Sequence, residues 1–275
     1  MDLFEKVKEK GVLIAAHRGV AGGNIACNTI EAFEAALIQG ADILEMDVFK
    51  TTDSQLYIFH TGKERMQLNR DIDVTALSST EVEKLHYVNG DFFETEQCIN
   101  KLDDVLEALK GRCLINLDRC WEDWKLVREC VERHQMRDQV ILKSHPEEKY
   151  FRMLEEVAPD YMYMPILSEE DHCTEILEGR NLRFVGAECT FTSEQAQIAS
   201  DEFIDCMKKK GKLLWANGIL YSSKVPLSAG HSDDISVTGN PEEGWGWLMD
   251  KGFDIIQTDW TMHCVNYLRE NNYRK

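Results

Sequence analysis

Residues 14–60 read IAAHRGVAGGNIACNTIEAFEAALIQGADILEMDVFKTTDSQLYIFH, and their pattern predicts alternating strands and helices. A short apolar run at residues 12–16 precedes an amphipathic helix at about residues 29–39, which ends at Gly40. Residues 43–49 and 56–60 are expected to form strands joined by a turn at residues 52–55. Because strands that alternate with helices pair in parallel, this stretch predicts the start of an α/β fold.

Charged side chains stand at the ends of these apolar runs. Glu45 and Asp47 are two residues apart, so both carboxylates point to the same face of an extended strand. Such like charges repel unless a cation or a proton lies between them, and all-oxygen ligands favour Mg2+ or Ca2+ over zinc. Arg18, next to His17, offers the planar guanidinium that suits a phosphate, and His60 ends the last run. The combination predicts metal-assisted phosphoester chemistry.

The order and spacing of these motifs resemble the start of the glycerophosphodiester phosphodiesterase family. The resemblance is carried by H-R-G (residues 17–19), N-T-x-x-A-F (28–33), G-A-D-x-x-E-x-D-V (40–48) and a strand that ends in His60. Downstream, L-I-N-L-D (114–118), L-L-W-A-N (213–217) and F-D-I-I-Q-T-D (253–259) resemble the family's third, seventh and eighth strands. The resemblance implies a (β/α)8 TIM barrel, a divalent metal on Glu45, Asp47 and Asp118, and acid–base catalysis by His17 and His60.

The chain departs from the family pattern at five places. They are Ala26-Cys27 for Pro-Glu, Thr61 for Asp, Asp53-Ser54 for an Asp-Gly turn, Asp118 for Glu, and Cys120 for a frequent Lys. Aspartate still binds a hard metal, with a shorter reach. The absence of the lysine removes one charge that would neutralise a phosphate, so the substrate is less determined than the metal site.

Composition limits the classes of function. The chain of 275 residues suits one barrel, and its formal charge of −18 argues against a nucleic-acid surface or adsorption to an anionic membrane. Residues 1–11 lack the apolar core of a signal peptide, and no run approaches membrane-spanning length. The nine cysteines, without C-x-x-C pairs or zinc spacing, suit reduced thiols in a cytoplasm. A cytoplasmic location is expected, with no stable membrane insertion; the oligomeric state stays open.

The rest of the chain continues the alternation. Strands are expected at residues 113–117, 140–143, 161–166, 184–187, 213–216 and 255–257. Helices are expected at residues 102–110, 121–134, 146–157, 171–178, 193–210 and 241–251, with a last one after residue 259 and a loop at 218–240. Residues 62–100 are polar, with one short helical piece opened by Ser79, and are too long for a barrel loop. We therefore expect one barrel over residues 1–275, with eight principal strands and an insertion at about 62–100.

Other polar residues fall near strand ends, where barrels of this kind carry their active sites. Lys143 is a candidate to bind the phosphate in place of the lysine that Cys120 replaces, or to form a salt bridge at the rim. Glu188 is a candidate to assist the metal, to bind a substrate hydroxyl or to form an ion pair. Trp215 is a candidate to cover an apolar part of the ligand or to belong to the core, and Asn217 is a candidate substrate-binding residue.

Three further positions keep a simpler alternative. Asp118 is expected to be the third metal ligand, although it would also suit the N-cap before Trp121. His231, with the two aspartates that follow at 233 and 234, is expected in a solvated loop, a lid being the alternative. Asp259 is expected near the mouth or as a cap of the last helix.

The expected function is hydrolysis of glycerophosphodiesters to glycerol 3-phosphate and an alcohol such as choline or ethanolamine. Sequence does not decide the headgroup, which histidine is the acid, or whether water or a neighbouring hydroxyl attacks. Two alternatives remain: a phosphodiesterase acting on a lipid or another small diester, and a non-catalytic phosphate-binding barrel.

Overall fold

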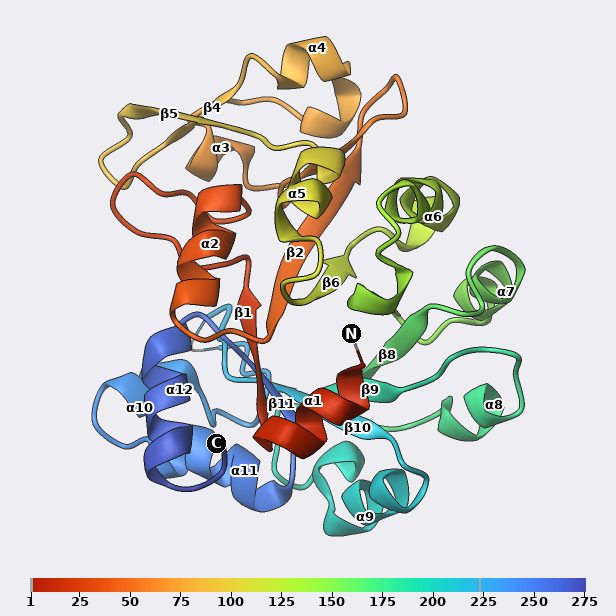
Figure 1. Ribbon diagram of the computed structural model, residues 1–275. Coiled ribbons are helices and arrows are strands. Elements are labelled where there is room, and N and C mark those ends of the chain that lie inside the picture. Colours follow the sequence, from red (N-terminus) through yellow and green to blue (C-terminus); the bar gives the residue numbers. More distant parts are fainter. Residues whose placement is uncertain (1, 223) are drawn as a thin grey trace.

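Eight parallel strands close into a barrel in the computed structural model, which describes residues 2–222 and 224–275 (Figure 1). Around the ring the order is β1, β2, β6, β7, β8, β9, β10 and β11, and β11 pairs with β1 to close it. The strands are β1 (Leu13–His17), β2 (Ile43–Lys50), β6 (Leu114–Asp118), β7 (Val140–Ser144), β8 (Met162–Ser168), β9 (Gly186–Thr190), β10 (Leu213–Asn217) and β11 (Ile255–Thr258). The expected (β/α)8 TIM barrel is confirmed.

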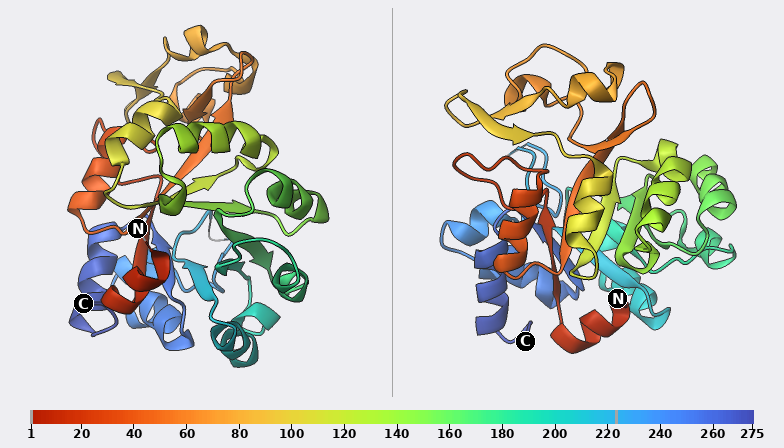
Figure 2. Two further views of the ribbon diagram at one scale, coloured as in Figure 1. Left: turned by 45° about the vertical axis from the view of Figure 1, so that its right-hand side comes forward. Right: turned by 45° about the horizontal axis from the view of Figure 1, so that its top comes forward.

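Helices surround the ring and connect its strands (Figure 2). The α-helices outside the insertion are α1 (Leu3–Lys10), α2 (Ile30–Ile38), α5 (Leu102–Leu109), α6 (Trp124–Arg133), α7 (Glu148–Val157), α8 (Thr174–Glu178), α9 (Asp201–Lys209), α10 (Asp233–Val237), α11 (Trp247–Lys251) and α12 (Thr261–Glu270). Short 3-10 turns are η2 (Trp121–Asp123), η3 (Arg137–Gln139) and η4 (Gln197–Ala199), and η5 (Glu242–Gly246) is a π-helix. Among the described residues, no helix combines the length and apolarity needed to cross a membrane.

The period of two along each strand separates a barrel interior from an outer core. Leu13 and Ala15 of β1 face inward with Ile43 of β2, in a buried cluster that runs around the ring. The intervening residues, such as Ile14 and Leu44, pack outward against the helices in the largest cluster. Since the same period continues to the strand ends, His17 faces inward above Ala15, and polar residues form the top of the interior.

The barrel floor is covered by α1, a helix that the sequence analysis did not assign. Asp2 caps it by accepting a hydrogen bond from the backbone N–H of Glu5, and Lys10 lies in its last turn. Leu3, which is fully buried, packs into the interior cluster from below. Leu3, together with the partly buried Val7, thus joins the first helix to the bottom of the barrel.

Strand β3 (Leu56–Ile58) lies outside the ring and pairs antiparallel with the far end of β2. The segment after it contains α3 (Glu64–Gln67), η1 (Val74–Ala76), α4 (Ser79–Val82), β4 (His86–Val88) and β5 (Glu94–Cys98). The pair β4–β5 forms its own sheet at the top of Figure 1, and this insertion has a separate apolar cluster around Phe59 and Tyr87.

Several element boundaries differ from the sequence-based expectation. The helix expected at residues 193–210 is shorter, because the side chain of Ser200 accepts the N–H of Phe203 and starts α9 at Asp201. The helix expected at 171–178 begins only at Thr174, and the one at 121–134 opens as a 3-10 turn. The strand expected at 184–187 runs from Gly186 to Thr190 instead.

Candidate active site at the barrel mouth

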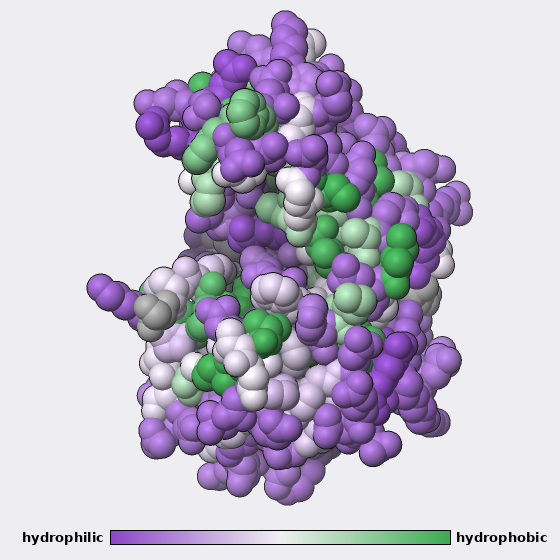
Figure 3. Space-filling view, turned by 90° about the vertical axis from the view of Figure 1, so that its left-hand side faces the viewer, coloured by the Kyte–Doolittle hydropathy of each residue, from purple (hydrophilic) through white to green (hydrophobic). Residues whose placement is uncertain are grey.

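The strand register brings polar residues together at the C-terminal end of the barrel. His17 of β1 lies opposite Glu45 of β2, and Asp47 of β2 lies opposite Asp118 of β6. Since all four positions face inward on neighbouring parallel strands, they share one mouth. The surface is hollowed between an upper lobe, which holds the insertion, and a lower lobe, and hydrophilic residues lie in the hollow (Figure 3).

The three carboxylates predicted to bind metal converge. Glu45, Asp47 and Asp118 each offer an oxygen, and these oxygens all lie within 4.8 Å of one another. Burial and the charge of Asp47 raise the pKa of Glu45 to about 8, and the same two causes raise the pKa of Asp118 to about 6. Oδ1 of Asp118 is buried without a hydrogen-bond partner among the described residues. An all-oxygen set with excess negative charge and a free oxygen fits a hard divalent cation.

Arg18 is held against two of these carboxylates. Its backbone N–H donates to Oε2 of Glu45 at 3.0 Å, and its Nε forms an ion pair with Oδ2 of Asp47 at 2.9 Å. The backbone of Arg18 is left-handed, with φ at 57°, a conformation that costs roughly 1–3 kcal/mol for a residue other than glycine. Strain of this kind, compensated by surrounding contacts, is typical of functional sites.

Asn28, the first residue of the N-T-I-E-A-F motif, also fixes Asp47. Its Nδ2 donates to Oδ2 of Asp47 at 2.8 Å, while its Oδ1 accepts the backbone N–H of Asp47 at 3.2 Å. The backbone N–H of Asn28 in turn donates to the carbonyl of Arg18 at 2.8 Å. The sequence analysis quoted this motif but did not assign Asn28 to the site, because its partners are contacts made only in the fold.

His17 is oriented by Asp259, which the sequence analysis considered mainly as a helix cap. The ring Nδ1 lies 2.8 Å from Oδ1 of Asp259, at the end of β11. Although burial alone lowers it, this hydrogen bond and the charge of Glu45 raise the pKa of His17 above its ordinary value. The contact arises because barrel closure pairs β1 with β11, and residues 242 apart in the chain meet there.

His60 reaches the mouth by a different route from the one expected. It does not end a barrel strand: β2 runs past the rim, and β3 returns antiparallel so that Phe59 donates its N–H to the carbonyl of Asp47. Nε2 of His60 lies 4.0 Å from Oδ1 of Asp47, and Nδ1 lies 2.9 Å from the carbonyl of Thr61. Burial, together with the charges of Arg18 and Arg119, lowers the pKa of His60.

Lys143, Glu188 and Asn217 form a buried network beside the carboxylates. Glu188 accepts from Nζ of Lys143 and from Nδ2 of Asn217, both at 2.7 Å. Lys143 is only 1% exposed, and its ammonium lies 3.1 Å above the ring centre of Trp215. The salt bridge considered for Lys143 is therefore present, with Glu188 as its partner. Trp215 is fully buried beneath it in the interior cluster, which favours the core alternative for this residue.

Arg119 is a cation at the mouth that the sequence analysis missed. It follows Asp118 directly, has a left-handed backbone with φ at 59°, and is exposed. Its Nη2 lies 3.4 Å from Oγ1 of Thr61, the residue after His60. The family pattern has a lysine at the position of Cys120, so Arg119 places a positive charge one residue earlier. That charge, next to Asp118, is the signal in the sequence that could have identified it.

The segment from His231 to Asp234 is not a solvated loop. His231 stacks on Trp247, with ring centres 3.8 Å apart, and Ser232 caps α10. Asp233 is buried and accepts from Nε1 of Trp245, Oγ1 of Thr258 and the N–H of Asp259. The segment thus supports the end of β11, because aromatic packing and buried hydrogen bonds hold it, and it indirectly positions Asp259.

Comparisons with known proteins match parts of the chain in sequence and nearly all of it in fold. A family model described as a domain of unknown function matches residues 163–268. A Bacillus altitudinis protein named glycerophosphodiester phosphodiesterase is 33% identical over 144 residues, covering 48% of this chain and 57% of that protein. An uncharacterized protein, YqiK, of Bacillus subtilis (strain 168) is 32% identical over 139 residues with the same coverage of both chains. The chain thus matches little more than half the length of these curated relatives.

Solved structures share the fold. A glycerophosphoryl diester phosphodiesterase from Parabacteroides distasonis has a TM-score of 0.75 and 17% identity, over 96% of this chain and 88% of that one. A phosphodiesterase from Oleispira antarctica, in complex with the product sn-glycerol-3-phosphate, has a TM-score of 0.68 and 16% identity. The match covers 94% of this chain and 96% of that one. These structures share the barrel fold that the family resemblance implied, and the named Bacillus altitudinis protein is similar in sequence to about half of the chain.

Proposed function

We propose that this protein hydrolyses glycerophosphodiesters to glycerol 3-phosphate and an alcohol, with a divalent metal and two histidines. The observation that carries the proposal is the meeting of His17, Arg18, His60 and three converging carboxylates at one barrel mouth. The named Bacillus altitudinis relative and the glycerol 3-phosphate bound to the Oleispira antarctica phosphodiesterase support the substrate class.

Glu45, Asp47 and Asp118 would hold the metal, Mg2+ or Ca2+. Their fit to such an ion is supported by the unpartnered Oδ1 of Asp118 and by the raised pKa values of Glu45 and Asp118. When bound, the ion would offset negative charge on the phosphoryl group and so favour attack of the nucleophile on the phosphorus. Asn28 and Arg18 keep Asp47 in place for that role.

Arg18 and Arg119 are the proposed phosphate-binding cations. Arg18 presents its guanidinium next to Asp47, and Arg119 projects from the adjacent strand end toward Thr61. Lys143 is already neutralised by Glu188, so we assign Lys143, Glu188 and Asn217 to shaping the site wall. Two arginines would replace the arginine and lysine of the family pattern.

The two histidines differ in a way that assigns their roles. Nδ1 of His60 donates to a backbone carbonyl, which leaves Nε2 as a proton acceptor, and its lowered pKa keeps the ring neutral near pH 7. His17 donates from Nδ1 to Asp259, and its raised pKa favours the protonated ring. We propose that His60 takes the proton from the attacking hydroxyl and that His17 protonates the leaving alkoxide.

An activity assay of the purified protein tests the proposal. Glycerophosphodiesters with choline, ethanolamine and inositol headgroups are incubated with the protein in EDTA and after Mg2+ or Ca2+ is added back. We expect release of glycerol 3-phosphate only with metal, and a kcat that is roughly 10²–10⁴-fold lower in His17→Ala and in His60→Ala. The surface variant His172→Ala is the matched control and should retain full activity.

Two outcomes would contradict the proposal. Full turnover after chelation, with metal content verified as negligible, would show that the reaction does not need a metal. A folded His17→Ala or His60→Ala variant with near-normal kcat would remove that histidine from the chemistry. The double variant should fall much less than the product of the two single effects, since the residues act as a unit.

We also propose that the insertion at residues 62–100 borders the leaving group. It contacts the loop after β1, where Gln97 accepts the N–H of Ala26 at 2.6 Å and Gln67 donates to Sγ of Cys27 at 3.0 Å. Phe92 and Phe93 are 60% and 71% exposed on this insertion, so a diester with an apolar headgroup is a second candidate substrate.

Substitution of the exposed aromatics tests this placement. We expect Phe92→Ser and Phe93→Ser to lower kcat/KM for lysophospholipid-like diesters while cleavage of glycerophosphocholine stays within about twofold. Ile38→Ser, at an exposed apolar position on α2, is the control. An unchanged preference among headgroups in both phenylalanine variants would show that this part of the insertion does not border the site.

A further inference from the structure

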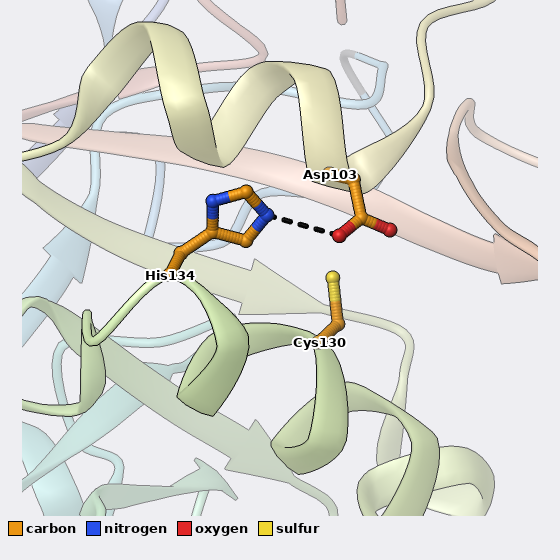
Figure 4. Close-up of side chains that lie close together, drawn as sticks. All are labelled: Asp103, Cys130 and His134. Atoms are coloured by element: carbon orange, nitrogen blue, oxygen red, sulfur yellow. Dashed lines mark hydrogen bonds and ion pairs between the residues drawn. The ribbon is translucent and has the colours of Figure 1, made fainter.

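A second cluster of metal-ligating side chains lies outside the barrel, between helices α5 and α6 (Figure 4). It consists of Asp103 from the first turn of α5, Cys130 from α6 and His134 from the C-terminal end of α6. One carboxylate oxygen, the sulfur and one ring nitrogen all lie within 4.8 Å of one another. The three donors belong to three chemical types and share no residue with the barrel mouth.

The local fold explains why these residues meet. Cys130 and His134 are four positions apart, so both project from the same side of α6. That side packs against α5, whose first turn brings Asp103 alongside. Cys130 is only 2% exposed and the side chain of His134 is 14% exposed, so two of the three donors have little freedom to turn away.

The hydrogen bonds within the cluster show how the donors point. Oδ1 of Asp103 lies 2.9 Å from Nε2 of His134, and Sγ of Cys130 lies within 4.8 Å of the ligand atoms of both residues. Although burial tends to raise it, the hydrogen bonds from His134 and Arg133 hold the pKa of Asp103 below its ordinary value. All three candidate ligand atoms therefore already lie close to a common point.

The outer nitrogen of the histidine is also paired. Nδ1 of His134 lies 3.2 Å from Oε2 of Glu107, one turn along α5 from Asp103. A histidine that binds a metal through one nitrogen usually donates its other N–H to a carboxylate, which fixes the ring and raises its basicity. Glu107 is therefore placed to be the second-sphere partner of a metal-bound His134.

We propose that Asp103, Cys130 and His134 form a zinc site that clamps α5 to α6. Sulfur, imidazole and carboxylate are the ligands that zinc takes in proteins, whereas the all-oxygen mouth suits Mg2+ or Ca2+. The ion replaces the thiol proton of Cys130 and the proton on Nε2 of His134, and both leave to solvent. A recess of about 230 Å3 lies beside Asp103 and Cys130. Through it a water molecule would reach the ion and serve as its fourth ligand.

Arg133 is the competing partner of Asp103. Its Nη2 lies 2.9 and 2.8 Å from the two carboxylate oxygens, but its side chain is largely exposed, so this pair contributes little. The arginine can stay on Oδ2 while the ion takes Oδ1. Removal of the charge of Arg133 should strengthen metal binding. Arg133→Gln therefore serves as a variant in which metal affinity is expected to rise rather than fall.

Cobalt substitution tests the site without any reference to phosphodiesterase activity. The full chain, stripped of metal by chelation, is titrated with Co2+, and the near-ultraviolet band of thiolate-to-cobalt charge transfer is recorded; Zn2+ is then added in competition. We expect one equivalent of Co2+ to produce the band and Zn2+ to remove it. Cys130→Ser should abolish the band, and Glu107→Gln should weaken binding roughly 10- to 100-fold.

Matched variants separate this site from the other thiols. Cys206→Ser removes an exposed cysteine, and Cys98→Ser removes the thiol whose sulfur lies 3.7 Å from Nδ1 of His86. Both should keep the band, as should Glu45→Gln at the mouth. If Cys130→Ser does not fold, His134→Gln takes its place, with loss of the band expected. Absence of a band in the unmodified protein, or its persistence in both Cys130→Ser and His134→Gln, would overturn the proposal.

Discussion

The two ends of the barrel hold carboxylates of the β2 segment under opposite conditions: Asp42 lies at the floor and Glu45 at the mouth. Asp42, just before the strand, accepts hydrogen bonds from the guanidinium of Arg274, from Nζ of Lys10 and from the N–H of Ile14. Although burial opposes it, these partners hold the pKa of Asp42 below its ordinary value. At the other end, Glu45 stands beside Asp47 with too few cations, and burial raises the pKa of Glu45 to about 8.

This difference separates the work of the two barrel ends. At the floor, Asp42 is matched by Arg274 and Lys10, so its charge contributes to stability. At the mouth, negative charge is left unmatched, at a cost to the metal-free fold, and a proton or an added cation relieves it. Substitutions at the two ends should therefore have opposite effects on activity and on stability.

The largest effect is expected for Glu45→Gln. If this carboxylate holds a metal that stabilises transition-state charge by several kcal/mol, kcat falls at least 10³-fold. The same variant removes a buried like charge, so its unfolding midpoint in EDTA stays equal to that of the wild type or rises. Steady-state assays measure kcat, and thermal unfolding measures the midpoint. An activity within tenfold of wild type would contradict the proposed role of the mouth carboxylates.

Asp42→Asn should do the reverse. The change leaves the buried guanidinium of Arg274 without its counter-charge, and we expect a loss of about 3–5 kcal/mol in the free energy of unfolding. The kcat of the folded protein should stay within about twofold. Asp160→Asn, which removes an exposed partner of Arg137, is the control and should cost no more than about 1 kcal/mol by urea denaturation.

Asp259→Asn should have a smaller effect that shows in the pH profile. The hydrogen bond from Asp259 raises the pKa of His17, so its removal lowers that pKa. If His17 is the general acid, the alkaline limb of kcat moves to lower pH and kcat near pH 7 falls roughly 10- to 100-fold. An alkaline limb that stays in place would show that another group donates the proton.

The smallest effect is a pair of opposite slopes of stability against pH in EDTA. The pKa of Asp42 is lowered, so its contribution is present above pH 3.8, the ordinary value, and is lost as the pH falls through the folded-state value. The pKa of Glu45 is raised, so the metal-free fold loses stability as the pH rises from 4.5 through about 8. Urea midpoints of wild type and both variants at pH 3–9 measure the slopes; parallel curves would contradict the comparison.

The sequence predicted the fold and the core of the mouth because strand periodicity is local. His17, Glu45 and Asp47 were found from apolar runs that end in polar residues and Asp118 from the family resemblance, and the structure brings all four together. Strand β3 was assigned as a strand, but its antiparallel position outside the ring depends on how far β2 extends past the rim.

The parts that sequence missed depend on contacts between distant segments. Asp259 meets His17 only when the barrel closes, and Asn28 gains its role from hydrogen bonds to Asp47. The spacing of Cys130 and His134 suggested no zinc site, because the third donor, Asp103, lies on a different helix. Trp215 was ambiguous because an aromatic residue at a strand end suits either a ligand or the interior, and only burial decides it.

The most direct test of the central claim is the shift in thermal unfolding caused by Mg2+ or Ca2+. Wild type, Glu45→Gln and Asp42→Asn are unfolded in EDTA and in a concentration of metal about 100 times its dissociation constant. The wild-type midpoint should rise by roughly 5 °C or more, Asp42→Asn should keep that gain from a lower starting point, and Glu45→Gln should lose it. Equal gains in all three proteins, or no gain in the wild type, would contradict the assignment of the mouth carboxylates as the metal site.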